Sequence, residues 1–169
     1  MLLKTSFKPT FVENSELVYS VDALRKNLSI LIKSKDGDRF AEDTFLYKTK
    51  VLTDNEVRFL DSTLIEIIPT PTVYRNNNIV DGIEINFDLI KNGDTVHRHF
   101  TSPSKSGNVV GFIITSKAIN TFKTILNDTI VSNYFDDVYN YIGDSTIKYT
   151  SKDRPIDKLR IKKYGWQLR

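Results

Sequence analysis

An Asn-Gly pair near the middle of the chain separates two runs of alternating apolar and polar residues. Asn92 and Gly93 both tolerate the positive φ angles of a type I′ turn, one of the commonest connections between antiparallel strands. The runs on either side, residues 80–90 and 95–102, have the period of two that sends successive side chains to opposite faces of a strand. The sequence therefore predicts a β-hairpin centred on these two residues.

A two-residue turn at this place also fixes the register of the hairpin. Its polar pairs are Asp88 with His97, Asn86 with His99 and Glu84 with Thr101. The other face carries Ile83, Ile85, Phe87, Leu89, Val96 and Phe100, with Arg98 opposite Phe87. A slip of one residue would exchange the two faces, so we expect this register to be well specified and the apolar face to be buried.

Strand-like and helical patterns surround the hairpin. Strands are predicted at 17–21, 28–33 and 45–51, the last with Phe45, Tyr47 and Val51 on one face and Lys48 and Lys50 on the other. A helix is predicted at 54–66, because Thr53 and Glu56 have capping-box spacing, and Pro69 and Pro71 end it. Its apolar face would carry Val57, Leu60, Leu64 and Ile68.

The second half of the chain predicts a longer helical region. An apolar run at 109–114 is followed by a helical stretch that Thr115 or Ser116 would cap. Asn127 and Asp128 either break this stretch or only bend it, and a helical stripe continues as far as Gly143, a suitable C-terminal residue.

Taken together, these patterns predict one α+β domain over residues 1–169. It would have an antiparallel or mixed sheet with a short helix and a longer helical region packed on one face. Hydrophobic residues make up 40% and charged residues 27% of the chain, which is ordinary for a globular protein. The basic segment 145–169 is predicted to form a final edge strand and tail, because Leu159 and Ile161 alternate with basic residues.

Composition excludes several kinds of chemistry. The chain has no cysteine, so disulfides, thiolate zinc sites and thiol catalysis are ruled out. No apolar run approaches the roughly 20 residues of a spanning helix, so we expect no membrane span. The N-terminus lacks the pattern of a signal peptide, which favours a cytoplasmic location unless a signal has been removed.

The two histidines, His97 and His99, stand at strand spacing and therefore share a face, with Asp88 across from them. Two imidazoles and a carboxylate can bind a divalent metal, and a metal-dependent hydrolase built on them is one hypothesis. The simpler interpretation, which we favour, is the solvated polar face of an amphipathic hairpin.

The last 25 residues hold eight basic and two acidic side chains, whereas the remainder has more acidic than basic ones. Aromatic residues interrupt this basic end, as in proteins that bind single-stranded nucleic acid. The candidate binding residues are Lys158, Arg160, Lys162, Lys163, Tyr164 and Trp166. The alternative, which we favour, is an edge strand whose lysines and arginines oppose aggregation.

No catalytic motif, nucleotide-binding loop or cofactor fingerprint is present, so we expect no cofactor and assign no catalytic residue. The leading hypothesis is a non-enzymatic module that binds another protein, such as a small inhibitor or an immunity-type protein. Nucleic-acid binding by the basic end and the metal-dependent hydrolase are the alternatives. The sequence does not indicate an oligomeric state.

Overall fold

The computed structural model of the chain describes residues 1–9, 13–33, 44–65, 67–69 and 82–142. The strands are β1 (Leu2–Pro9), β2 (Asn14–Val21), β3 (Lys26–Lys33), β4 (Thr44–Val51), β5 (Ile83–Lys91) and β6 (Asp94–Thr101). The helices are α1 (Asp54–Leu60), which continues as a short π-helix (Asp61–Ile65), α2 (Val109–Leu126) and α3 (Thr129–Tyr139).

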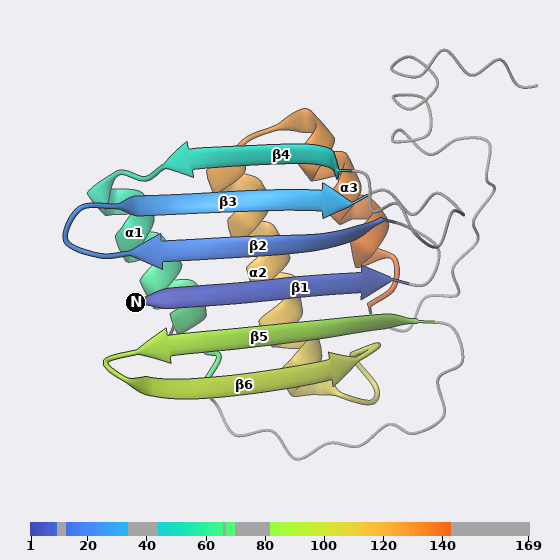
Figure 1. Cartoon of the computed structure of the whole chain (residues 1–169). Helices are drawn as coiled ribbons and strands as arrows, with labels where there is room; N and C mark the ends of the chain where they lie inside the picture. The colour runs from blue at the N-terminus through green and yellow to red at the C-terminus, as the bar shows by residue number, and fades with distance from the viewer. Residues whose placement is uncertain (10–12, 34–43, 66, 70–81, 143–169) are drawn as a thin grey trace, which may run out of the picture.

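The six strands form one sheet in the order β4-β3-β2-β1-β5-β6, and every neighbouring pair is antiparallel. The helices all lie behind the sheet in Figure 1, so they cover one of its faces. We call the other face, which none of the described helices covers, the open face. The predicted α+β class is confirmed, with a short helix and a longer helical region packed on an antiparallel sheet.

Strand β1 lies between β2 and β5 in the middle of the sheet, although the sequence patterns above do not predict it. Leu3 and Phe7 are buried, while Lys4 and Lys8 point to the open face. Buried and exposed residues therefore alternate along β1, but the polar Thr5 lies between Leu3 and Phe7 on the buried side. The pairing of β1 with β5 joins segments about eighty residues apart, a contact that no local pattern reveals.

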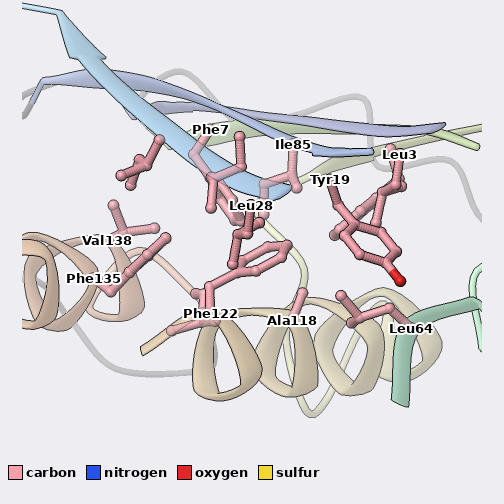
Figure 2. Close-up of a cluster of buried hydrophobic side chains, with 14 of the residues drawn as sticks. Leu3, Phe7, Tyr19, Leu28, Leu64, Ile85, Ala118, Phe122, Phe135 and Val138 are labelled. Atoms are coloured by element: carbon pink, nitrogen blue, oxygen red, sulfur yellow. The ribbon is translucent and has the colours of Figure 1, made fainter. Parts of the chain in front are cut away.

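The hydrophobic core fills the space between the sheet and the helices (Figure 2). Phe135 of α3 meets Phe7 of β1 edge to face, with ring centroids 5.6 Å apart, and stacks on Phe122 of α2. The Tyr19 hydroxyl donates to Asp61 Oδ1 at 2.8 Å, which joins β2 to the start of the π-helix. Burial, followed by this hydrogen bond, raises the pKa of Tyr19 well above its usual value.

The hairpin forms as predicted. Asn92 and Gly93 have φ angles of 55° and 91°, as a type I′ turn requires. Strands β5 and β6 pair in the predicted register, with Asp88 opposite His97. The expected apolar face is turned to the helices, and both of its phenylalanines are buried.

Helix α1 begins at the predicted capping box. Thr53 Oγ1 accepts from the Glu56 N–H at 3.3 Å, and the Glu56 carboxylate accepts from the Thr53 N–H at 2.9 Å. Leu60, Leu64 and Ile68 are buried, so the predicted apolar face is confirmed.

Helix α2 begins before the expected caps, so that prediction was wrong. Thr115 and Ser116 lie inside the helix, and Asn108 is the N-cap, with its side-chain oxygen accepting from the Gly111 N–H at 2.9 Å. The first turn packs closely on β6, since a Cβ at Gly111 would lie 2.8 Å from the Phe100 ring. The apolar run 109–114 is therefore the start of a partly buried helix. Periodicity alone does not distinguish such a run from a buried strand.

Of the two alternatives at Asn127 and Asp128, the break is observed. Asn127 adopts the left-handed conformation, with φ 44° and ψ 54°, and ends α2. Asp128 then caps α3 by accepting from two N–H groups of its first turn. Gly143 lies outside the described residues.

In length and hydropathy α2 would qualify as a membrane-spanning helix, but half of this stretch is buried inside the fold. Its inward side packs on the sheet around Ala118 and Phe122 (Figure 2). Core packing therefore accounts for the apolar character of the buried half of α2.

The two lysines of the edge strand β4 point beneath the sheet to the ends of the helices. Lys48 forms an ion pair with Asp128, the N-cap of α3. Lys50 donates to the carbonyl of Ile125 in the last turn of α2 at 2.6 Å, and its Nζ lies 2.7 Å from a carboxylate oxygen of Glu56. These contacts place cations at a helix C-terminus and beside the carboxylates that cap two helix N-termini.

We expect Phe87→Ala to cost about 3–5 kcal/mol, because it removes a fully buried aromatic side chain. The control is Glu84→Ala, an exposed position on the same strand, which should change stability by no more than about 0.5 kcal/mol. Chemical denaturation of both variants measures this difference. A loss below about 1 kcal/mol for Phe87→Ala would contradict the assignment of faces.

We also expect acid to destabilise the protein partly through Glu56. Hydrogen bonds from Lys50 and from Thr53 lower its pKa from 4.5 to about 2. Its contribution is therefore complete above pH 4.5 and is lost as the pH falls toward 2. In Lys50→Met the stability measured by denaturation should fall less steeply over this range, whereas the exposed control Lys117→Met should retain the parent slope. Equal slopes for all three proteins would contradict the contact.

Candidate functional site

The open face is the candidate site, because it is a large surface that the described helices leave uncovered (Figure 1). A strand of this sheet sends one side chain to the helices and the next to the open face. Where two apolar residues are consecutive, only one of them can enter the core. Such neighbours leave one apolar residue on the open face in five strands: Leu2 in β1, Val18 in β2, Leu31 in β3, Tyr47 in β4 and Ile90 in β5.

The strand register joins these five residues into one line, which we call the diagonal stripe. Ile90 lies directly opposite Leu2, and Leu31 lies directly opposite Tyr47. Val18 connects the two pairs, because it is the diagonal neighbour of Leu2 on one side and of Leu31 on the other. Diagonal neighbours in an antiparallel sheet are about 7–8 Å apart, within reach of long side chains. The stripe therefore crosses the open face from β5 to β4.

Exposure along the diagonal stripe is greatest at its two ends. The Tyr47 side chain is 66% exposed and Ile90 is 40% exposed, while the three residues between them are partly exposed. The orientation of β4 causes the high exposure of Tyr47, since the ion-paired lysines of that strand occupy the side facing the helices.

Charge is distributed unevenly about the stripe. On one side lies a group that we call the uncharged corner: Ser20, Asn27, Ser29, Thr49 and Val51. The open-face charges of the six strands all lie on the other side: Lys4, Lys8, Glu16, Lys33, Glu84 and Asp88. Three are basic and three are acidic, so this side of the face has no net charge when the histidines are neutral.

The histidines occupy the edge of the charged side, on β6. His97 Nδ1 lies 2.6 Å from Asp88 Oδ1, and His99 Nδ1 lies 2.7 Å from Asn86 Oδ1. An amide oxygen only accepts, so this contact is a hydrogen bond when Nδ1 of His99 carries the proton. The Asn86 amide in turn donates to Ser6 Oγ at 3.1 Å. The result is a polar network that crosses β6, β5 and β1.

This arrangement does not bring the two imidazoles to one point. Each histidine contacts its own cross-strand partner, and the His97 side chain is 71% exposed. Within the ranges that the structure describes, no group of three or more histidine, aspartate or glutamate side chains is placed to hold a metal ion. His97, His99 and Asp88 thus share a face as expected, but as neighbouring pairs.

The predicted residues of the basic end, Lys158, Arg160, Lys162, Lys163, Tyr164 and Trp166, lie outside the described residues. The same holds for the predicted strand around Leu159 and Ile161. Their roles remain predictions from the sequence.

The sequence patterns did not predict the diagonal stripe, although consecutive apolar residues within the strands point to it. Leu17-Val18-Tyr19 and Ile30-Leu31-Ile32 are uninterrupted apolar runs inside strands of a sheet with one open face. The middle residue of each run must point away from the core. Alternation within a single strand indicates which residues share a face, but the alignment of these residues across strands requires the register.

Comparison of the sequence with models of protein families and with curated proteins gave no match.

We expect no tight zinc site at His97 and His99. Zinc sites usually need three or four converging ligands, and these imidazoles are directed to separate partners. Calorimetric titration with zinc should show the same weak heat for the parent protein and for the His97→Ala, His99→Ala double variant. Sub-micromolar binding that the double variant abolishes would contradict this and would favour the hydrolase hypothesis.

Proposed function

We propose that the protein is a non-enzymatic binding module that uses the open face to bind a partner protein. The observation that carries the proposal is the diagonal stripe, a continuous line of exposed and partly exposed apolar side chains bordered mainly by polar residues. Apolar surface rimmed by polar groups is characteristic of protein-binding sites, and tyrosine is enriched at their centres.

The chemistry of the open face indicates what such a partner presents. Opposite the diagonal stripe and the uncharged corner, the partner's surface would be apolar and uncharged, because a lysine or carboxylate buried there would lose its hydration without an ion pair. Beyond the stripe, the balanced charges around Lys4 and Asp88 would fix orientation more than they add affinity. A surface with equal numbers of basic and acidic groups is poorly suited to a phosphate backbone.

The polar network at β6 supports binding more than catalysis. The Asp88–His97 pair resembles the carboxylate–imidazole half of a general-base system, but such systems act on a nucleophile in a site that excludes water. The His97 side chain lies mostly in solvent, at the edge of the sheet. Histidine in this setting serves well as a hydrogen-bonding group at the rim of an interface.

A narrower form of the proposal is that the protein is a small inhibitor or an immunity-type protein, which neutralises its partner by occupying it. Such a protein would form a stoichiometric complex with the product of a neighbouring gene. Copurification of the two proteins after coexpression tests this form separately.

The basic end supports a second candidate, nucleic-acid binding. It concentrates cations around Tyr164 and Trp166, a composition suited to phosphate contacts and base stacking. This candidate uses a different part of the chain. Variants of the open face and variants of the basic end therefore distinguish the two functions.

We expect Ile90→Asp to weaken partner binding by about tenfold or more, because it places a charge on the diagonal stripe. The partner is identified by affinity capture with the full-length protein, and its affinity is then measured by calorimetry. Ile113→Asp on α2 is the matched control, since Ile113 is 45% exposed, close to the 40% of Ile90. The control should bind within about twofold of the parent protein.

Loss of binding in Ile113→Asp but not in Ile90→Asp would move the site to the helical face and refute the proposal. Loss only in the Lys162→Ala, Lys163→Ala variant would also refute it. If nucleic acid is then the ligand, log affinity should fall with log salt by about 0.7 per phosphate contact with a single strand.

A further inference from the structure

The outward edge of β4 is unpaired within the part of the chain that the structure describes. β4 is the last strand on its side of the sheet, and in the described part of the chain no strand pairs with its outer edge. Leu52 N–H donates to the carbonyl of Lys26 at 2.7 Å, which marks these opposite residues as a hydrogen-bonded pair. Backbone groups alternate in direction along an antiparallel strand. Those of Tyr47, Thr49 and Val51 therefore point away from β3.

Edge strands are usually protected by lysines, by proline or by irregular backbone. Residues 44–51 contain no proline, and both lysines of β4 are directed under the sheet and paired with Asp128 and Glu56. The only register irregularity between β3 and β4 lies at the far end, near Lys33. The exposed side of the edge thus consists of uncharged residues that favour β-structure: Tyr47, Thr49 and Val51.

The opposite edge of the sheet differs in this respect. On β6 the Arg98 guanidinium donates to the carbonyl of His97 at 2.9 Å and to the carbonyl of Pro69 at 2.8 Å. It therefore occupies an acceptor along that edge and joins the segment 67–69 to it. Among the residues that the structure describes, no charged side chain has the equivalent position on the exposed side of β4.

We propose that β4 pairs with β4 of a second copy of the chain, antiparallel and around a two-fold axis through Thr49. The sequence of the edge is self-complementary in this register. Thr49 would face the partner's Thr49. Tyr47 of each copy would face Val51 of the other copy. Threonine pairs and pairs of aromatic with β-branched residues are favourable across antiparallel strands. All three residues with outward backbone groups would find hydrogen-bonding partners.

The charges agree with this arrangement. On the open face the pairing brings no charged residue of β4 opposite another. On the helix side Lys48 would lie opposite the partner's Lys50, but each of these lysines already has a carboxylate partner in its own chain. The two uncharged corners would meet at the two-fold axis, so that the dimer presents one broad uncharged surface between two charged ends.

Sedimentation velocity or light scattering on the full-length protein over a wide range of concentration tests the proposal. We expect a monomer–dimer equilibrium that Thr49→Lys shifts to monomer, because it places two ammonium groups on the axis. Thr95→Lys is the matched control, since it makes the same change on the other edge strand and should leave the dimer intact. Thermal unfolding of both variants shows that each is folded.

Thr49→Pro gives an independent check. It removes an N–H that points away from β3, so it should block pairing of the edges and keep the hydrogen bonds between β3 and β4. In the absence of other cysteines, oxidation of Thr49→Cys should also trap a disulfide-linked dimer, because opposite Cα atoms in a hydrogen-bonded pair are about 5.5 Å apart. Thr95→Cys should remain monomeric under oxidation.

A parent protein that stays monomeric up to its solubility limit would overturn the proposal, as would a dimer that Thr95→Lys dissociates and Thr49→Lys does not. A dimer that dissociates only in Leu31→Lys would indicate stacking of open faces instead, which also overturns it. The inference does not depend on the proposed partner binding.

Discussion

The placement of Lys48 and Lys50 beneath the sheet is the constraint on which the rest of the structure depends. These two side chains reach the N-cap of α3, the last turn of α2 and the capping box of α1. One edge strand thus connects to the ends of all three α-helices. Burial alone would raise the pKa of Asp128, but hydrogen bonds from Lys48 and from the first turn of α3 lower it, so the carboxylate stays charged in this contact.

The proposed binding surface follows from the same constraint. Because a strand exposes alternate side chains on alternate faces, turning the lysines inward turns Tyr47, Thr49 and Val51 outward. Tyr47 then completes the diagonal stripe, and the other two residues complete the uncharged corner. The edge of β4 also loses the charges that normally discourage strand pairing. The proposed partner binding by the open face and the proposed self-association at its edge therefore both depend on this one orientation of β4.

The sequence correctly predicted the features whose geometry is determined by a few neighbouring residues. The Asn92-Gly93 turn and the capping box at Thr53 each specify their own geometry within a few residues, and both formed as expected. The central position of β1 and the orientation of β4 depend instead on contacts between distant segments, such as Lys48 with Asp128, eighty residues apart. Alternation shows that Tyr47 and Lys48 lie on opposite faces, but only the helix ends decide which face is buried.

The orientation of β4 can be measured directly, because a chain without cysteine allows a single thiol to be introduced as a probe. The measurement compares the rates at which a water-soluble maleimide labels Tyr47→Cys and Tyr19→Cys in dilute, folded protein. Tyr47 points to the open face and Tyr19 is buried against the helices. The structure predicts rapid labelling at position 47, close to the rate in the unfolded chain, and strong protection at position 19. Equal protection at both positions would contradict the orientation of β4 and the open face derived from it.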